Sequence, residues 1–503
     1  AALDLVNTSL GERPVTAVLY THSHADHFGG VRGVTTQEDV DAGRTQIIAP
    51  AGFVEHAVSE NLIAGNLMGR RAVLMFGRSL PKSAIAHVGS GLGPGLPDGT
   101  IGLILPTEEI GPERTQKRID GVLFEFTDAG GTEAPAEFMF YLPEKRALCT
   151  SEVATGTFHN ILTPRGAKVR DSLAWSRVIE DVLEKYGDKS DVVFASHHWP
   201  TWGTDNVKKY LRNQRDVYRY VHDQTMRLAN SGATMEEAAE AIEEPPFMTG
   251  NFDTRGYYGT LKHNAKAVYQ GYFGWWSGVP ANYNALPEVE KAPRYVAAMG
   301  GADATLKIGA DAFGAGEYRW AAEVLNHLVF AEPDNDRARK WLAASYEQLG
   351  FQAESGAWRS YYLTAAQELR HGLPAEGGSI GANSDFLSAV PSLKLFDSMA
   401  VRFNPTLNKM GEHDIQFVFT DRNEVFTLEI GSASLTPRTI ASDTPAVSVT
   451  TTRGAFDKLI LQEATFPQLV QAGEITVEGN QLALLNMFQS LETPPFWLNV
   501  VEP

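Results

Sequence analysis

Three histidines and one aspartate fall within six residues of the chain, at His22, His24, Asp26 and His27. This HxHxDH motif follows the apolar run 14–20, which has the β-branched and aliphatic composition of a strand. Packing these four groups into an apolar core would carry a large desolvation cost, whereas metal ions would satisfy all of them. Alternation along an extended segment lets His22 and His24 face one metal, while the following turn carries Asp26 and His27 toward a second. The motif therefore predicts a binuclear metal site at the end of a strand.

Length and composition bound what else the chain can be. Its 503 residues exceed what one hydrophobic core usually supports, and we expect three domains. The 43 Lys and Arg against 61 Asp and Glu give a formal charge of −18, which argues against nucleic acid as a partner. No run approaches the roughly 18 to 20 apolar residues of a membrane helix, so we expect no membrane span. The sole cysteine, Cys149, excludes an internal disulfide and is predicted to be a buried structural thiol.

The pattern of the chain changes twice. Residues 1–228 alternate short β-branched runs with helical patterns and glycine-rich loops, which predicts an α/β domain. Residues 229–374 are rich in Ala, Glu, Leu and Tyr, and segments starting at Gly316 and Gly350, 34 residues apart, resemble one tetratricopeptide-type helical pair. We expect this all-α domain to serve packing or dimerisation. A linker rich in Gly, Pro and Ser at 372–385 precedes an α+β domain at 385–503.

The HxHxDH motif and this domain order resemble the metallo-β-lactamase superfamily and, within it, the alkylsulfatases of the dodecyl-sulfate-degrading type. The resemblance covers nearly the whole chain. It implies a metallo-β-lactamase αββα sandwich, a helical dimerisation domain that makes a homodimer, and a C-terminal α+β domain similar to sterol carrier protein 2. Superfamily members place further ligands in a glycine-containing turn, after a strand and in a later loop. This sequence offers Glu133, Glu152 and His197 at those places, and alkylsulfatases resemble it in both glutamates.

The resemblance implies two Zn²⁺ ions per chain. One ion is held by His22, His24 and Glu133 and the other by Asp26, His27 and His197, with Glu152 bridging them. The glutamates also admit harder ions such as manganese or iron.

Two other residues stay open as ligands. Glu137 is either a ligand or a carboxylate that does not touch metal, and His198 would point away from its neighbour if both lay on a strand.

The implied activity is hydrolysis of linear alkyl sulfate esters, such as dodecyl sulfate, to alcohol and inorganic sulfate by metal-activated water. Asn160 and Arg165 lie in a segment similar to the sulfate-binding part of the family, the other interpretation being a turn asparagine and a surface arginine. His263, in a segment 255–264 that resembles one closing over the active site, is expected to donate a proton or bind sulfate, with His159 as the alternative.

The sequence leaves the cleaved bond and the exact substrate open. Attack at carbon would make the chain an inverting sec-alkylsulfatase, and another superfamily hydrolase of an ester or thioester is a further alternative. A non-enzymatic lipid-binding protein is disfavoured by the complete ligand set.

Three further features outside the predicted metal site also lead to expectations. We expect the loop 88–99 to be a mobile segment lining the site, because Pro94 and Pro97 interrupt the helix that a nucleotide loop would need. Arg70, Arg71 and Arg78 are either surface charges or secondary anion contacts. The resemblance of the C-terminal domain implies an apolar tunnel suited to a surfactant chain.

The start of the chain is unusual for the implied fold. Only about 20 residues precede the HxHxDH motif, whereas superfamily domains usually begin with several strands, so we expect N-terminal strands to be missing from this chain. The first residues predict a helix and no signal peptide. The resemblance alone favours a periplasmic or secreted location.

Overall fold

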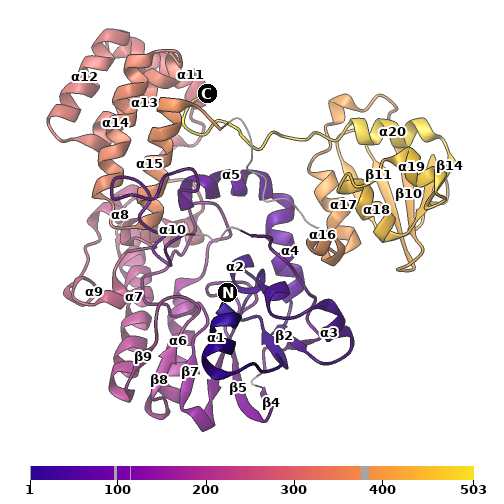
Figure 1. Ribbon diagram of the computed structural model, residues 1–503. Helices are drawn as coiled ribbons and strands as arrows, with labels where there is room; N and C mark the ends of the chain where they lie inside the picture. Colours follow the sequence, from indigo (N-terminus) through magenta and orange to yellow (C-terminus); the bar gives the residue numbers. More distant parts are fainter. Residues whose placement is uncertain (1, 96–98, 114, 375–383) are drawn as a thin grey trace. The chain divides into compact units, whose positions relative to one another are not determined.

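The computed structural model describes residues 2–95, 99–113, 115–374 and 384–503, with the side chains of 59–61 left aside (Figure 1). The chain forms two compact units, each assembled from segments that are far apart in the sequence. Unit 1 comprises Ala1–Asn66, Gly99–Glu109 and Ser379–Pro495. Unit 2 comprises Leu67–Asp98, Ile110–Gly378 and Phe496–Pro503.

The N-terminal part of unit 1 is built on a small sheet of order β1-β2-β3. The strands are β1 (Ala17–Leu19), β2 (Gln46–Pro50) and β3 (Glu108–Ile110), and β1 runs parallel to β2. The helices are α1 (Ala2–Leu10), α2 (Ala25–Phe28), α3 (Gln37–Asp41) and α4 (Phe53–Ile63), with a 3₁₀ turn at Val31–Gly33. The expected strands at 14–20 and 44–50 and the expected N-terminal helix are thus present.

The C-terminal part of unit 1 is a five-stranded sheet covered by helices. Its order is β12-β11-β10-β13-β14, and β10 and β13 form its parallel pair. The strands are β10 (His413–Phe419), β11 (Glu424–Ile430), β12 (Leu435–Arg438), β13 (Val447–Thr451) and β14 (Ile475–Gly479). The helices are α16 (Ser384–Ala389), α17 (Ser392–Ala400), α18 (Arg453–Ile460), α19 (Phe466–Gln471) and α20 (Gln481–Gln489). This is the predicted α+β domain; of the linker before it, residues 375–383 lie outside the described residues.

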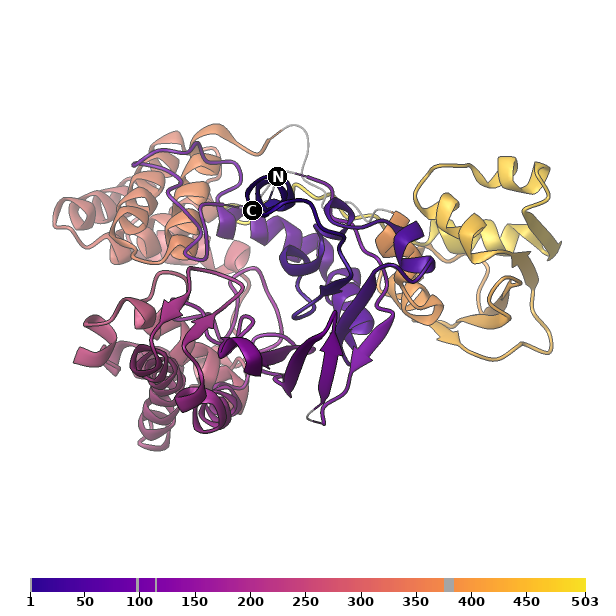
Figure 2. The ribbon, with the colours of Figure 1, turned by 60° about the horizontal axis from the view of Figure 1, so that its bottom comes forward.

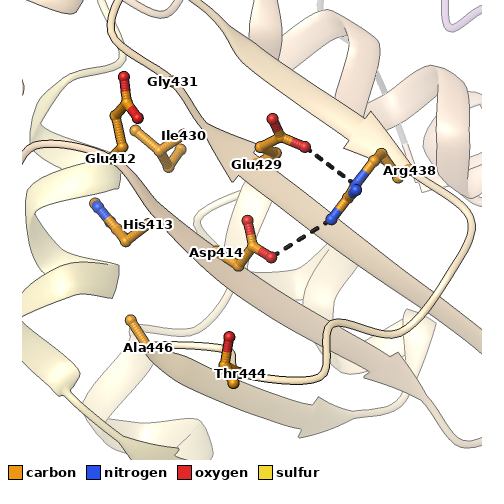
Figure 3. Close-up of a pocket in the computed structure, with 9 residues that line it drawn as sticks. All are labelled: Glu412, His413, Asp414, Glu429, Ile430, Gly431, Arg438, Thr444 and Ala446. Atoms are coloured by element: carbon orange, nitrogen blue, oxygen red, sulfur yellow. Dashed lines mark hydrogen bonds and ion pairs between the residues drawn. The ribbon is translucent and has the colours of Figure 1, made fainter.

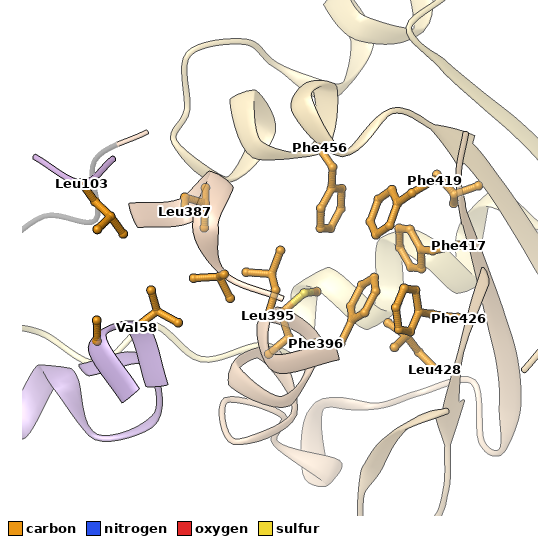
Figure 4. Packing of buried hydrophobic residues seen from close by; sticks show 14 of the residues in the cluster. Val58, Leu103, Leu387, Leu395, Phe396, Phe417, Phe419, Phe426, Leu428 and Phe456 are labelled. Carbon is orange, nitrogen blue, oxygen red and sulfur yellow. The ribbon is translucent and has the colours of Figure 1, made fainter. Parts of the chain in front are cut away.

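Phenylalanine rings fill the space between this sheet and its helices (Figure 4). The ring of Phe396 on α17 lies 5.2 Å from those of Phe417 and Phe426, and Phe456 lies 5.4 Å from Phe417. Each of the four side chains is at least 96% buried. This close packing occupies the interior in which we expected an apolar tunnel.

A polar pocket of about 490 Å³ lies over the same sheet (Figure 3). Arg438 on β12 reaches across it to Asp414 on β10 at 3.4 Å and to Glu429 on β11 at 3.3 Å. Arg438 thus pairs with two of the three carboxylates that line the pocket, and we assign the pocket no ligand.

The two parts of unit 1 share one hydrophobic core, although more than 250 residues separate them in sequence. Phe28 on α2 packs against Phe386 on α16 with ring centroids 5.7 Å apart. Nε and Nη2 of Arg32 donate to the two carboxylate oxygens of Asp385, at 2.5 and 2.8 Å. The helix that carries Asp26 and His27 is thus supported by a helix of the C-terminal domain.

Unit 2 contains a six-stranded sheet of order β4-β5-β6-β7-β8-β9. The strands are β4 (Gln116–Ile119), β5 (Val122–Asp128), β6 (Phe138–Leu142), β7 (Ala147–Cys149), β8 (Val192–Phe194) and β9 (Thr201–Trp202). Helix α6 (Ser172–Tyr186) begins at its N-cap Asp171 and packs against the 27-residue α7 (Thr204–Asn230). The fully buried Trp175 of α6 stacks on Tyr218 of α7 at 4.3 Å. Cys149 is buried as predicted, and burial raises the pKa of its thiol to about 12.

The remainder of unit 2 is helical, as predicted. Its helices are α5 (Gly65–Phe76), α8 (Met235–Ala241), α9 (Pro246–Thr249), α10 (Leu261–Phe273), α11 (Glu288–Ala298), α12 (Ala302–Gly314), α13 (Tyr318–Ala331), α14 (Asp336–Gln352) and α15 (Gly356–His371). Consecutive helices from α12 to α15 lie side by side (Figure 2). The segments starting at Gly316 and Gly350 correspond to α13 with α14, and to the end of α14 with α15.

The last eight residues of the chain also belong to unit 2. Val501 joins the core formed with Leu325 and Leu342. Arg70 is fully buried, donates through Nε to the Leu498 carbonyl and pairs with Glu368 at 2.7 Å. Arg70 is therefore an internal cation that joins three segments of unit 2, and the expectation of a surface charge is wrong for it. In the described parts of the chain, no helix is both long and apolar enough to cross a membrane.

Candidate metal centre

The HxHxDH motif lies in unit 1 between β1 and the end of α2. His22 is fully buried, and its ring centroid lies 5.0 Å from that of His24 and 4.2 Å from that of His27. Nε2 of His27 lies 3.1 Å from the Asp26 carboxylate. Ligand atoms of His22 and His24 lie within 4.8 Å of each other, as do those of Asp26 and His27. Within this loop the residues therefore group as the sequence predicted.

A glycine is required directly behind the motif. A Cβ at Gly29 would lie 2.5 Å from the Ala25 carbonyl oxygen and 2.6 Å from Cγ2 of Ile101. The chain therefore has no room for a side chain at the residue that ends α2.

Unit 2 holds the predicted carboxylates. Glu133 lies in the turn between β5 and β6, Glu152 follows β7, and both are at least 97% buried. Ligand oxygens of the two lie within 4.8 Å of each other. Nε2 of His197, in the loop after β8, lies 3.3 Å from Oε1 of Glu152. The three ligand positions predicted in this half of the chain thus converge within one compact unit.

Glu137 is a third buried carboxylate in this cluster. It is not solvated, because its side chain is fully buried at the start of β6. Burial, reinforced by the charge of Glu133, raises the pKa of Glu137 well above its usual range, although the Glu152 backbone N–H opposes this shift.

An arginine that the sequence analysis did not single out lies beside the carboxylates. Nη2 of Arg170 donates to Oε1 of Glu133 at 2.6 Å, and Nη1 donates to the Asn160 carbonyl at 2.6 Å. Arg170 directly precedes the N-cap of α6, and nothing local in its sequence distinguishes it from a surface arginine. Its role depends on the fold bringing residues 133 and 170 together.

His159 is buried at the same place. Its Nε2 lies 3.1 Å from Oε1 of Glu152, and its Nδ1 lies 3.0 Å from the Asn160 carbonyl. Nη1 of Arg170 also lies 3.3 Å from Nδ1, so the ring is held between a carboxylate on one side and a carbonyl and a guanidinium on the other.

The Asn160 side chain is fully buried, and neither its Oδ1 nor its Nδ2 has a hydrogen-bond partner among the residues that the structure describes. Burying an amide without partners is costly, which favours a ligand as the missing partner. Its backbone is held by Asn264 of α10, which donates to the His159 carbonyl at 2.8 Å and accepts from the Ile161 N–H at 2.9 Å. Asn264 is a second residue that sequence reasoning missed.

The segment 255–264 packs directly on this loop. The Gly259 N–H donates to the Phe158 carbonyl at 2.8 Å, and the Phe158 N–H donates to the Arg255 carbonyl at 3.0 Å. Nε2 of His263 donates to the Leu162 carbonyl, and burial lowers the pKa of this histidine. Arg165 donates through Nη1 to the Gly166 carbonyl at 3.1 Å.

His198 is not on a strand, because β8 ends at Phe194. Its backbone is left-handed, with φ of 65°, and its ring lies over Gly156, where a Cβ would come within 2.9 Å of Cγ. Burial, with a smaller effect of His197, lowers the pKa of His198.

Three family models match the chain. The metallo-beta-lactamase superfamily matches residues 1–197, alkyl sulfatase dimerisation matches residues 234–372, and alkyl sulfatase C-terminal matches residues 381–503. A linear primary-alkylsulfatase from a Pseudomonas species is 45% identical over 505 residues, which cover 100% of this chain and 75% of that protein. The chain belongs to the alkylsulfatase family.

Other relatives within the alkylsulfatase family differ in the substrate that their names state. An (R)-specific secondary-alkylsulfatase from a Pseudomonas species is 41% identical to this chain. The match covers 100% of this chain and 76% of that protein. The solved structure of the stereoselective inverting sec-alkylsulfatase Pisa1 from Pseudomonas sp. matches with a TM-score of 0.95 and 39% identity, covering 100% of this chain and 79% of that one. The expected fold class, with a metallo-β-lactamase domain, a helical dimerisation domain and a C-terminal alkyl sulfatase domain, is confirmed.

The donor set in this alkylsulfatase suits divalent cations. Imidazole nitrogens and carboxylate oxygens are the usual ligands of zinc in hydrolases. Burial and the charges of Glu133 and Glu152 raise the pKa of Glu137, and a bound cation would offset this concentration of negative charge. The residues present therefore fit the metal ions that the family implies.

The segment before the loop 88–99 is held by α15. Arg359 of α15 donates to the Ala86 carbonyl at 3.0 Å and to the Ala84 carbonyl at 2.7 Å, and Nε2 of His87 lies 3.2 Å from the Pro94 carbonyl in the loop. That the loop is mobile stays a prediction; residues 96–98 lie outside the described residues.

Proposed function

We propose that the chain is a binuclear zinc hydrolase that cleaves linear alkyl sulfate esters to alcohol and inorganic sulfate. The observation that carries this proposal is the 45% identity to a linear primary-alkylsulfatase across the whole chain. The buried histidine and carboxylate groups support it, because they supply the donors that a metal-dependent hydrolase needs.

We assign His22, His24 and Glu133 to one zinc ion, Asp26, His27 and His197 to the other, and Glu152 to both. The assignment rests on the family's order of ligands and on the grouping of these residues within each compact unit. When bound, the two ions lower the pKa of a coordinated water so that it is deprotonated near neutral pH.

Asn160 and Arg165 are the proposed sulfate-binding residues. The buried Asn160 amide offers a donor, and a guanidinium can bind two sulfate oxygens at once. Groups fixed in advance stabilise the charge that develops on the transferred group without reorganising during the reaction.

Two histidines are candidates for the proton donor. The sequence favours His263, whose ring is fixed by the bond from Nε2–H to the Leu162 carbonyl. The alternative, His159, has Nε2 3.1 Å from Oε1 of Glu152 and Nδ1 beside the Asn160 carbonyl and Nη1 of Arg170. Comparing the His263→Gln and His159→Gln variants assigns the role.

A second candidate function is inverting hydrolysis of secondary alkyl sulfates by attack at carbon. It is favoured by the TM-score of 0.95 to the inverting sec-alkylsulfatase and by the 41% identity to an (R)-specific secondary-alkylsulfatase. The two candidates differ in the bond that breaks and not in the metal chemistry.

We further propose that the chain forms a homodimer through its helical domain, since residues 234–372 match an alkyl sulfatase dimerisation family. Between Lys266 and Glu288 no residue carries a charge. Several large side chains there are exposed, including Trp275 at 67% and Tyr283 at 63%. An uncharged surface rich in Trp and Tyr is typical of the core of a protein interface.

The deciding experiment measures sulfate release by the purified protein from dodecyl sulfate and from 2-octyl sulfate. It is repeated after chelation and after zinc is restored, and in ¹⁸O-labelled water. We expect zinc-dependent release from dodecyl sulfate. Label in sulfate indicates S–O cleavage, and label in the alcohol indicates C–O cleavage.

The matched variants are His22→Ala, which removes a proposed ligand, and His56→Ala, which removes a histidine of α4 outside the site. Loss of release in the first variant alone supports the ligand assignment. Release from 2-octyl sulfate alone selects the second candidate function, and no release from folded, zinc-replete protein contradicts both.

A further inference from the structure

Glu137 is placed to act on the two proposed carboxylate ligands without touching metal itself. Its Oε1 accepts the backbone N–H of Glu152 at 3.0 Å, and its Oε2 accepts the backbone N–H of Ala134 at 3.2 Å. The Thr132 hydroxyl also lies 3.3 Å from Oε2. One buried carboxylate thus joins the residue after β7 to the turn between β5 and β6.

The turn that carries Glu133 depends on this connection. Glu133 lies between Thr132 and Ala134, both of which contact Glu137. The turn is closed by a hydrogen bond from the Gly131 N–H to the Ala134 carbonyl at 2.8 Å, and Gly131 has a φ of 83°. A few backbone hydrogen bonds set the direction of the Glu133 side chain in this turn. Loss of the contact between Glu137 and Ala134 would therefore allow that side chain to change direction.

The chemistry of the contact explains why a carboxylate stands here. The two N–H donors approach different oxygens of Glu137, and a carboxylate is the side chain that offers two acceptor oxygens. In glutamine, one of the two positions would be an NH₂ group, which would face an N–H donor. A residue needed for packing alone would be apolar at a fully buried position.

We propose that Glu137 is a positioning residue of the metal centre: by holding the backbones of residues 134 and 152, it sets the spacing and direction of Glu133 and Glu152. This inference rests on the proposed function, because it takes these two glutamates to be metal ligands. Residues that orient ligands typically affect metal affinity by about 10- to 100-fold.

The test compares the parent protein with Glu137→Gln, which keeps the shape of the side chain and loses one acceptor. The metal-free proteins are loaded with Co²⁺, and the visible ligand-field spectrum, the Co²⁺ affinity and the thermal midpoint are measured. We expect a shifted spectrum and about 10- to 100-fold weaker binding in the variant. Glu368→Gln is the matched control, since Glu368 is also a buried carboxylate of unit 2 and pairs with Arg70.

The outcomes separate this inference from the proposed function. An unchanged spectrum and affinity in Glu137→Gln, or a loss no larger than in Glu368→Gln, overturns the positioning role. If Glu137→Gln does not fold, Glu137→Asp, which keeps both acceptors on a shorter arm, replaces it, and failure of both to fold shows a purely structural role. A parent protein that binds no Co²⁺ contradicts the proposed function itself.

Discussion

At the scale of single residues, the candidate site combines polar groups whose burial is unfavourable because they lose their contacts with water. Glu133, Glu137 and Glu152 lie together in unit 2, and Asn160 is buried with no internal partner among the described residues. Folding alone gives no reason to keep an amide in such a place. The burial of Asn160 is understandable if its amide NH₂ donates a hydrogen bond to a substrate oxygen.

We expect Asn160→Ala to lower kcat/KM for alkyl sulfate by about 100-fold, because one fixed donor to the developing charge is lost. Sulfate release gives kcat/KM, and the zinc content is measured in parallel and should not change. Asn213→Ala is the control, because Asn213 is a partly buried asparagine of α7 whose amide donates to the Asp253 carboxylate. A variant of Asn160 with the kcat/KM of the parent would exclude it from substrate binding.

At the scale of secondary-structure elements, the site loop 157–161 is held by the segment before α10. Gly259 is the point of closest approach, and a Cβ there would lie 2.3 Å from the His159 carbonyl oxygen and 2.9 Å from the Asn160 nitrogen. The loop can stay in place only if residue 259 has no side chain.

We therefore expect Gly259→Ala to cost about 1–3 kcal/mol in the free energy of unfolding, as overpacking does, and to lower activity by moving the loop. Urea denaturation measures the first effect and sulfate release the second. Gly314→Ala, at the end of α12, meets nothing within 4 Å and should leave both unchanged. Equal stability and equal activity of the two variants would show that the segment before α10 accommodates the added methyl group without effect.

Local patterns account for what could be predicted at these scales. His22, His24, Asp26 and His27 fall within six residues, and the strands and long helices have clear periodicity, so the motif and these elements can be predicted from short stretches of sequence. Arg170 and Asn264 could not be found in this way, because each acts on residues of another element. The contact of Arg359 with Ala86, just before the loop 88–99, could not be predicted for the same reason.

At the scale of the whole molecule, the helical domain presents the uncharged segment between Lys266 and Glu288. Trp275 and Tyr283 are exposed there and lie with their rings nearly parallel, 6.4 Å apart. A monomer would leave this surface in water, whereas a second copy of the chain would cover it.

We expect light scattering to give twice the mass of the chain for the parent protein and the single mass for Trp275→Asp, because a buried charge opposes association. Trp202→Asp is the control, since Trp202 is 67% exposed, as Trp275 is, and lies outside the dimerisation-matching residues. A dimer that survives Trp275→Asp would place the interface elsewhere.

The shared core of unit 1 has a consequence for synthesis of the chain. The apolar side chains of β1, β2 and α4 are made early, but Leu387, Phe396 and Met487, which belong to the same core, are made last. The HxHxDH loop is therefore synthesised long before its support from α16, since Asp385 and Phe386 follow Phe28 by more than 350 residues. Such late, long-range closure makes folding slow and exposes apolar surface meanwhile. We expect the apolar side chains of residues 17–63 to be prone to aggregation until α16 and α17 have been translated.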